Sequence, residues 1–171
     1  MKTFRHILAG LALAFVTALS FAPSAQAQAL TDYAENKIVD AMLRGQTLGA
    51  PATVYVALYT AACNDAGGGT EVSGGSYARV AVTSSLANWA GTQSAGSTTA
   101  SSGTGGQTSN NAAITFPAPT ANWGTVTHFA LLDASTAGNM WICQSLTASK
   151  SINSGDASPS FSAGALTVTF Q

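Results

Sequence analysis

The feature that most constrains this fold is a series of short β-type runs that begins at Ala52. Thr53–Thr60 (TVYVALYT) is apolar on both faces, which predicts a central strand. Gly-rich turn signals within Asn64–Gly69 and Ser73–Ser76 separate this run from the alternating run Tyr77–Thr83. Many short strands with turns between them are typical of a sandwich or a small barrel.

The second half of the sequence continues this pattern. Thr125–Asp133 is the longest run, and the turn residues Ala137-Gly138-Asn139 predict that Met140–Leu146 returns beside it as a hairpin. The other expected strands are Ala112–Phe116, Ser149–Asn153, Ser160–Ser162 and Leu166–Phe170. We therefore predict a mostly β protein, an antiparallel β-sandwich of about eight short strands with one N-terminal α-helix.

That helix is expected from about Thr31 to Arg44, where it would cover one face or one end of the sandwich. Asp32 is the expected N-cap, with Glu35 reaching back to the backbone, and Gly45 follows as a favourable C-terminal residue. Its apolar positions recur at helical spacing: Leu30, Ala34, Ile38, Val39, Met42 and Leu43.

Residues 84–110 carry no such periodicity. Ser, Thr, Gly and Ala make up most of this segment, and Leu86 and Trp89 are its main apolar anchors. It is too long for a simple turn. We expect a low-complexity loop with a packed start near Trp89 and a mobile tip, in either a functional or a flexible role.

Residues 1–27 have the layout of a secretory signal peptide. A positively charged start precedes the uncharged apolar run Ile7–Ala22, and Ala25-Gln26-Ala27 supplies a small-x-small cleavage pattern. The apolar run is shorter than the roughly 20 residues of a membrane-spanning helix. We expect cleavage near Ala27 or Ala29 and a single domain over residues 28–171. That domain would have no membrane span and would be secreted, extracellular or at the cell surface.

Charged residues make up only 8% of the chain, far below the roughly 25% of ordinary soluble domains. After cleavage, four basic residues remain against seven acidic ones, so the formal net charge is −3. The basic residues are scattered, which argues against a nucleic-acid partner. Low charge also removes the repulsion that keeps monomers apart, as in a protein that contacts copies of itself.

The two cysteines are Cys63 and Cys143. An even number in an exported chain favours a disulfide over a metal site, and the alternative is a pair of buried free thiols. Two thiols and the one remaining histidine, His128, do not complete a tetrahedral zinc site, so no metal is expected.

Two long, unusual segments are GGGTEVSGGSYARV (Gly67–Val80) and NWGTVTHF (Asn122–Phe129), and LTDYAENKIVDAMLRG (Leu30–Gly45) is a third. They resemble a family of small bacteriophage tail-fibre-like proteins, and the resemblance extends from about Leu30 to Gln171. It implies a compact, mostly β domain with a structural or adhesive role and no catalytic residues. Members normally lack a signal peptide and cysteines at these positions, so the sequence looks like a phage-type module recruited for export.

Catalytic chemistry has few candidates here. Any acid–base scheme after cleavage depends on His128, which alternation places on one face of a strand with Val126, Ala130 and Leu132. A packed or edge histidine is the better explanation. No serine lies in a nucleophile-elbow pattern, and the glycines mark turns, without the pattern of a phosphate loop. We expect no enzyme activity and no cofactor.

Two binding possibilities stay open at this point. Asp65, Glu71 and Asp156 lie in expected loops and offer oxygen ligands for calcium, although their spacing matches no known calcium loop. Trp89, Trp123 and Trp141 offer flat faces that stack on sugars. Trp123 and Trp141 are better explained as core residues, which leaves Trp89 as the candidate glycan contact.

We therefore expect a secreted structural protein that assembles with copies of itself into an extracellular filament, appendage or surface layer. The candidate contacts are Gln28–Asp32 and the last strand, in which Leu166, Val168 and Phe170 alternate with threonines. The last strand is either a final core strand or an edge strand that pairs with a neighbour. The main alternative is a secreted adhesin that binds glycans or surface receptors through Trp89 as a monomer or small oligomer.

Overall fold

The computed structural model describes residues 30–92, 97, 99–103 and 105–170. The predicted signal peptide lies outside these residues, as do parts of the predicted loop tip. The described chain contains one helix followed by nine short strands, all in antiparallel pairs, which confirms the predicted mostly β fold class. The elements are α1 (Asp32–Leu43), β1 (Thr53–Ala61), β2 (Thr70–Glu71), β3 (Val80–Thr83), β4 (Gln107–Ser109), β5 (Ile114–Thr115), β6 (Gly124–Leu132), β7 (Met140–Ile152), β8 (Ser160–Phe161) and β9 (Thr167–Thr169).

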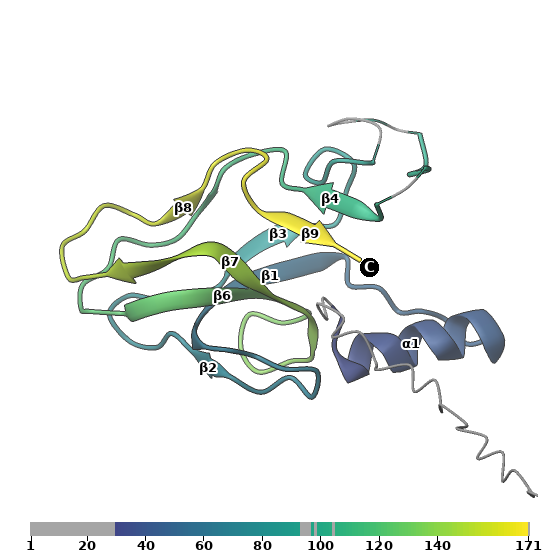
Figure 1. Ribbon diagram of the computed structural model, residues 1–171, viewed down its shortest axis with the longest axis horizontal. Helices are drawn as coiled ribbons and strands as arrows, with labels where there is room; N and C mark the ends of the chain where they lie inside the picture. Colours follow the sequence, from purple (N-terminus) through teal and green to yellow (C-terminus); the bar gives the residue numbers. More distant parts are fainter. Residues whose placement is uncertain (1–29, 93–96, 98, 104, 171) are drawn as a thin grey trace, which may run out of the picture.

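The main sheet has five strands, with β1 and β6 at its centre (Figure 1). β2 and β3 pair with successive parts of the same edge of β1, and β7 pairs with β6 as the predicted hairpin partner. β7 is longer than expected, because it joins the predicted strands Met140–Leu146 and Ser149–Asn153 into one. The connecting residues contain no Gly or Pro, so the strand continues through them.

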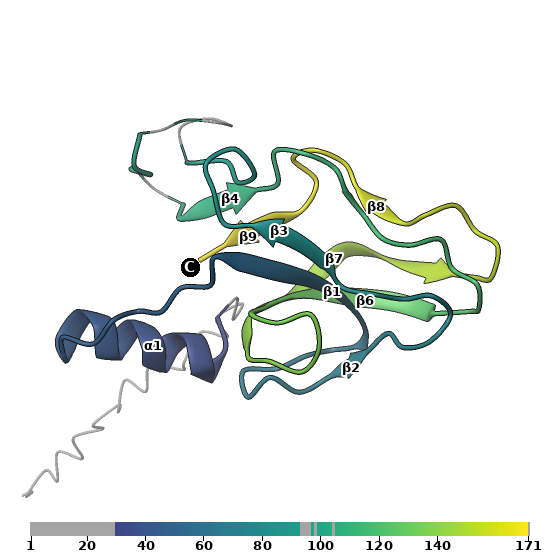
Figure 2. The same cartoon turned by 180° about the vertical axis from the view of Figure 1, so that it is seen from behind.

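Two two-stranded ribbons, β4–β9 and β5–β8, lie over one face of the main sheet (Figures 1 and 2). The main core fills the space between these layers. It contains Val56, Leu58, Phe129 and Leu131 from the sheet and Ile114, Phe116, Leu166 and Val168 from the opposing segments. β4 lies inside the segment predicted to be a loop, and Trp89 pairs with Asn110 in an isolated bridge. The expected structureless loop is therefore shorter than 84–110.

A smaller core cluster lies on the other face of the sheet. It contains Ala57, Tyr59, Ala130, Leu132, Met140 and Cys143. β6 supplies side chains to both clusters, but a register shift between Val126 and His128 interrupts its alternation. Val126 consequently packs with the main core, so its expected place on the face of Ala130 and Leu132 is wrong.

The helix α1 begins close to its predicted start, but its N-cap is Thr31 instead of Asp32. The Thr31 hydroxyl donates a hydrogen bond to the carbonyl oxygen of Met140, and the Thr31 N–H donates to the carbonyl of Trp141 at 3.1 Å. These bonds attach the start of the helix to β7. Among the described residues, no helix has the length and apolar character needed to cross a membrane.

Only the first part of α1 packs against the domain. Ala34 is its one buried residue, and the ring of Tyr33 meets that of Trp141 edge-on at 5.3 Å. The helix then extends past the end of the sheet (Figures 1 and 2). Val39, Met42 and Leu43 are exposed. The helix therefore covers less of the sandwich than its apolar positions predict.

Candidate functional site

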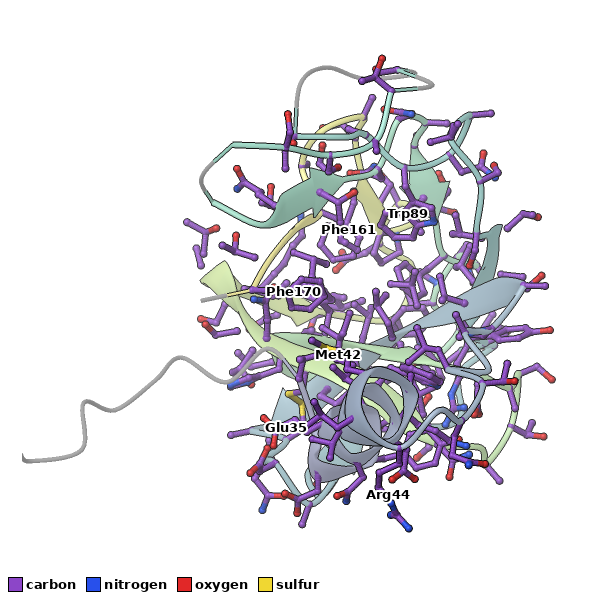
Figure 3. All side chains as sticks on the ribbon, turned by 90° about the vertical axis from the view of Figure 1, so that its right-hand side faces the viewer. Glu35, Met42, Arg44, Trp89, Phe161 and Phe170 are labelled. Carbon is purple, nitrogen blue, oxygen red and sulfur yellow. A yellow bond between two sulfur atoms is a disulfide. The ribbon has the colours of Figure 1, made fainter. Side chains whose placement is uncertain are left out.

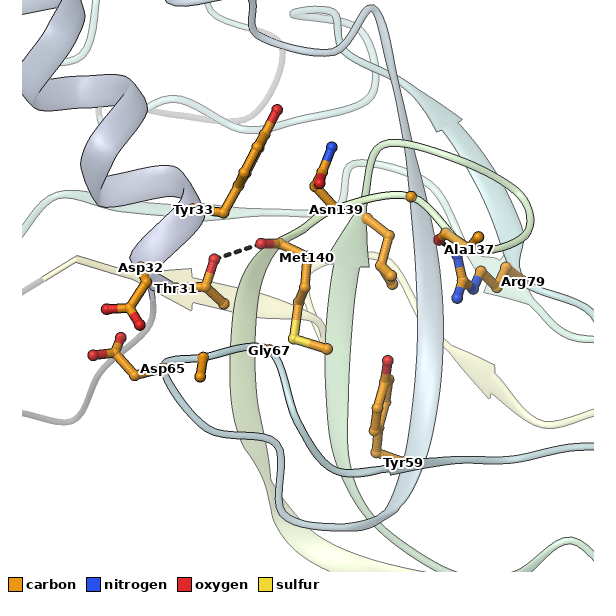
Figure 4. Close-up of a pocket in the computed structure, with 13 residues that line it drawn as sticks. Thr31, Asp32, Tyr33, Tyr59, Asp65, Gly67, Arg79, Ala137, Asn139 and Met140 are labelled. Carbon is orange, nitrogen blue, oxygen red and sulfur yellow. Dashed lines mark hydrogen bonds between the residues drawn. The ribbon is translucent and has the colours of Figure 1, made fainter.

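A hollow of about 490 Å³ lies where the start of α1, the loop after β1 and the β6–β7 turn meet (Figure 4). A backbone hydrogen bond joins two of these segments: the N–H of Asp32 donates to the carbonyl of Asp65 at 2.8 Å. Arg79, Tyr59 and Met140 line its other side. The hollow thus has acidic groups at one end and a basic group at the other.

The carboxylates of Asp32, Glu35 and Asp65 lie within 4.8 Å of one another. Asp32 and Glu35 are exposed, and exposed acidic groups cluster in many proteins without holding an ion. The calcium set considered from the sequence is not brought together. Glu71 pairs with Arg79, and Asp156 accepts a hydrogen bond from the N–H of Asn153 at 2.8 Å.

Arg79 has a structural role in the hollow. Its guanidinium binds both oxygens of the Glu71 carboxylate, at 2.8 and 2.7 Å, and donates to the carbonyls of Ala134 and Ala137 at 2.7 Å each. The hydrogen bond with Glu71 raises the pKa of Arg79. This side chain is only 8% exposed, so it holds the β6–β7 turn against β2 and β3 with the charge paired.

Tyr77 completes this polar network from the side of the main core. Its hydroxyl donates to Glu71 at 3.0 Å and accepts a bond from the N–H of Leu58 at 2.9 Å. Burial raises the pKa of Tyr77 well above its usual value, so the phenol remains protonated at physiological pH. A protonated tyrosine that bonds to two structural partners is not positioned as a general base.

His128 is half-buried in β6, and its Nδ1 lies 2.8 Å from the hydroxyl of Thr127. Across the described part of the chain, no carboxylate hydrogen-bonds to its ring. A catalytic histidine is normally oriented by such a partner and lies beside a nucleophile. His128 therefore has the surroundings of a packed strand residue.

Cys63 and Cys143 form a disulfide with their Cα atoms 6.1 Å apart. The bridge links the loop after β1 to β7 across 80 residues of sequence. Cys143 belongs to the smaller core cluster and Cys63 packs against it. The disulfide thus fastens the loop beside the hollow to the main sheet.

The residues proposed for assembly lie partly inside the domain. Leu166 and Val168 are 1% and 0% exposed in the main core, whereas Phe170 is 45% exposed. β9 pairs with β4, as a final core strand would. This pairing is within one chain, and a contact of the last strand with a second copy of the protein stays a prediction. Gln28 and Ala29 of the N-terminal segment lie outside the described residues, as does the expected cleavage site.

Trp89 is partly buried and packs against the main core. A shallow hollow of about 330 Å³ lies further along its segment, with Gly91, Thr92, Gln107 and Ser109 among its lining residues. Its lining offers hydroxyl and amide groups but no aromatic ring. A glycan contact at Trp89 stays a prediction.

Sequence reasoning missed two residues that organise the structure. Arg79 gives no local signal, because its partners Ala134 and Ala137 lie more than 50 residues away. Asn110 is 1% exposed and donates to the carbonyls of Ala112 and of Ser162, which lies 52 residues away, so no spacing rule predicts its role. Both residues stabilise the fold.

Comparison with known proteins relates nearly the whole described chain to one family. A family model described as "Podophage GP4 fiber I protein gp80" matches residues 29–169. No curated protein matches the chain. The matched range covers the helix, all nine described strands and both cysteines.

Proposed function

This chain belongs to the podophage GP4 fiber I protein gp80 family, and we propose that it is an exported, structural member that assembles with copies of itself. The observation that carries the proposal is the family match over residues 29–169. Fibres are built from repeated subunits, and a subunit of this kind needs surfaces for other copies more than it needs a reactive site.

The composition of the surface supports self-assembly. Only 8% of the residues are charged. Within the described residues, two of the basic side chains are already paired with acidic ones, Arg79 with Glu71 and Arg44 with Asp40. Subunits with so little charge approach one another with little electrostatic repulsion.

Two features support a location outside the cytoplasm. Residues 1–27 have the pattern of a signal peptide, and Cys63 and Cys143 form a disulfide, which is a bond that persists in oxidising compartments. The product would be an extracellular filament, appendage or surface layer made by a phage-type module.

Adhesion is the second candidate function. The observation that favours it is the shallow polar hollow near Trp89, since hydroxyl and amide groups hydrogen-bond to sugars. In this alternative the protein acts as a monomer or small oligomer and binds glycans or surface receptors.

The experiment is to express the full chain in a bacterium and to examine the cells and medium by fractionation and negative-stain microscopy. We expect a processed protein outside the cytoplasm, in filaments or sheets that antibodies to the chain decorate. An Ala25→Leu/Ala27→Leu variant, which lacks the small-x-small pattern, is the control for export. Unprocessed cytoplasmic protein in the parent would contradict export. An exported monomer that binds a glycan array would favour adhesion.

A further inference from the structure

One positive charge of the described chain has no partner within it. Arg44 and Arg79 form salt bridges, and the Lys37 ammonium lies 5.7 Å from the centre of the Tyr33 ring. Lys150, in contrast, is exposed, and its side chain forms no ion pair or hydrogen bond with any described residue. Its ammonium is therefore available to a partner.

Negative charge gathers at the hollow of about 490 Å³ beside the start of α1, which we call the acidic hollow. Asp32 and Glu35 are exposed there, and within the described part of the chain their side chains form no ion pair. The carboxylate of Asp65 lies within 4.8 Å of theirs. Arg79 adds no net charge on the other side, because Glu71 binds its guanidinium. The acidic hollow therefore attracts a cation.

The acidic hollow also contains a buried hydroxyl group without a partner. Tyr59 is 5% exposed, and Figure 4 shows its hydroxyl pointing into the hollow between Met140 and Arg79. This hydroxyl bonds to no described residue. Burial raises the pKa of Tyr59, so the phenol stays protonated and can both donate and accept. Buried polar groups normally have a partner, which indicates that the hollow receives a polar group from outside.

A lysine side chain has the chemistry that this hollow requires. Its ammonium donates three hydrogen bonds and accepts none, so carboxylates and a hydroxyl are the partners it needs. Leu132 and Met140 add apolar surface to the lining, and the four-carbon stem of a lysine packs on such surface. A metal ion would use the carboxylates but not this apolar lining.

Lys150 and the acidic hollow lie toward opposite ends of β7. Met140, the first residue of β7, lines the hollow, and Lys150 is ten residues further along the strand, a distance of roughly 30 Å. Figure 1 shows the far end of β7 on the opposite side of the molecule from α1. Figure 3 looks onto the α1 side, where Glu35 lies on the helix. A chain therefore cannot place its own Lys150 in its own hollow, whereas a second copy can.

We propose that the acidic hollow is a subunit contact, in which the Lys150 ammonium of one copy binds the acidic hollow of the next. The inference rests on the proposed function, because it names one interface of the self-assembling subunit. The contact joins two different surfaces at opposite ends of the subunit, so each added copy offers a new hollow or a new Lys150. A heterologous contact of this kind propagates into a filament.

The first test is Lys150→Glu in the mature, disulfide-bonded protein, followed by sedimentation. Lys150 is exposed, so the fold should persist. We expect the protein concentration needed for assembly to rise at least about tenfold, because the new charge repels the carboxylates. Asp156→Asn is the matched control. It changes a charge in the turn after β7, outside the proposed contact, and should not weaken assembly.

The second test combines two variants that each lack one half of the contact. Lys150→Glu keeps the acidic hollow, and Asp32→Asn/Glu35→Gln keeps Lys150. At concentrations where the parent assembles, each variant alone should be monomeric, and an equimolar mixture should form a one-to-one dimer that grows no further. Circular dichroism checks α1, because both acids lie in its first turn. A mixture of folded variants that stays monomeric overturns the contact.

Tyr59→Phe tests whether the ammonium enters the hollow. The substitution removes only the hydroxyl and keeps the ring in the smaller core cluster, so the fold should persist. We expect the concentration needed for assembly to rise about threefold, because the incoming group loses one hydrogen-bond partner. Unchanged assembly of Tyr59→Phe would overturn entry of Lys150 into the hollow.

The remaining outcomes separate the two proposals. If Lys150→Glu assembles as the parent does, the contact is wrong and the proposed function stands. If the parent stays monomeric at every concentration, both fail. If the parent is monomeric and n-butylamine, which resembles a lysine side chain, binds to it in calorimetry, the acidic hollow is a site for small amines and the subunit contact is overturned.

Discussion

Asn110 joins two segments, the chain after β4 and the connection between β8 and β9, through one buried side-chain amide. Its Nδ2 donates to the carbonyls of Ala112 and Ser162, each at 2.8 Å, and its Oδ1 accepts from the N–H of Leu166 at 2.8 Å. Ala112 lies between β4 and β5, and Ser162 and Leu166 lie between β8 and β9, so these groups are outside the strand ladders. Because an unsatisfied buried polar group costs more than a hydrogen bond contributes, one such residue decides how the connections around β8 are held.

Replacing Asn110 should therefore destabilise the domain without changing its surface. We expect Asn110→Ala to lower the free energy of unfolding by about 2–3 kcal/mol, because Leu166 N–H and two carbonyls lose their partner. Urea unfolding monitored by fluorescence measures this loss. Asn111→Ala is the control, since Asn111 donates one exposed bond to Leu86, and its cost should be below about 1 kcal/mol.

Asp133 gives the β6–β7 turn a dependence on pH. Desolvation alone would raise the pKa of Asp133, but the hydrogen bonds from the side chain and backbone of Asn139 lower it overall. A lowered pKa in the folded state stabilises the protein at pH values above the unfolded pKa of about 3.9. This stabilisation is lost as the pH falls through the folded pKa.

We therefore expect Asp133→Asn to be less stable than the parent at pH 6 and to approach the parent as the pH falls through the lowered pKa of Asp133. Thermal unfolding of both proteins across this range measures the difference. Asp156→Asn is a comparison at another turn carboxylate, which accepts one backbone bond from Asn153. A difference for Asp133→Asn that stays constant down to about pH 2 would show that the charge is not responsible.

At the scale of elements, sequence patterns predicted those strands that carry their own apolar signal. Thr53–Thr60 and Thr125–Asp133 were recognisable because both faces of β1 and β6 are buried. β4 (Gln107–Ser109) was not recognisable, because its sequence has no apolar alternation and it is a strand only by its pairing with β9. The β6 sequence also gives no signal for its bulge, because the register shift after Val126 arises from the pairing of β6 with β7. In α1, periodicity predicted the helix but did not predict which apolar side chains would remain uncovered.

The last strand and the residue before it supply two buried side chains to the main core. Leu166 and Val168 are both buried in the main core, so deleting Leu166–Gln171 should abolish cooperative unfolding and leave an unfolded chain. Phe170→Ser is the matched variant, because Phe170 is partly exposed and its loss should preserve the fold. Circular dichroism and thermal melting distinguish these results. A truncated protein that folds would mean that β9 belongs to assembly and not to the core.

The disulfide is the covalent link between the loop after β1 and the edge strand β7. A bridge across 80 residues contributes roughly 4 kcal/mol in the chain-entropy model. We expect Cys63→Ser/Cys143→Ser to lose about 2–4 kcal/mol of stability, measured by urea unfolding. Intact mass after alkylation of the exported parent should show no free thiol. Two alkylated cysteines in folded parent protein would contradict the bridge.

At the scale of the whole molecule, the buried polar residues stabilise the fold, and the surface is left with little charge. Arg79 and Glu71 pair, Tyr77 bonds to Glu71 and to Leu58, and His128 has no carboxylate partner among the described residues. The surface of the described chain carries few charges, and it includes the exposed apolar side chains of α1. The family, the disulfide and this surface together favour the proposed structural role, in which the protein binds other copies of itself.

Sedimentation of the purified mature chain, residues 28–171 with the disulfide intact, tests this central claim most directly. Over a wide range of protein concentration, we expect a shift from monomer to high-mass species, whose shape microscopy can identify. A single monomeric species at every concentration, in the buffer conditions of the compartment to which the protein is exported, would contradict self-assembly.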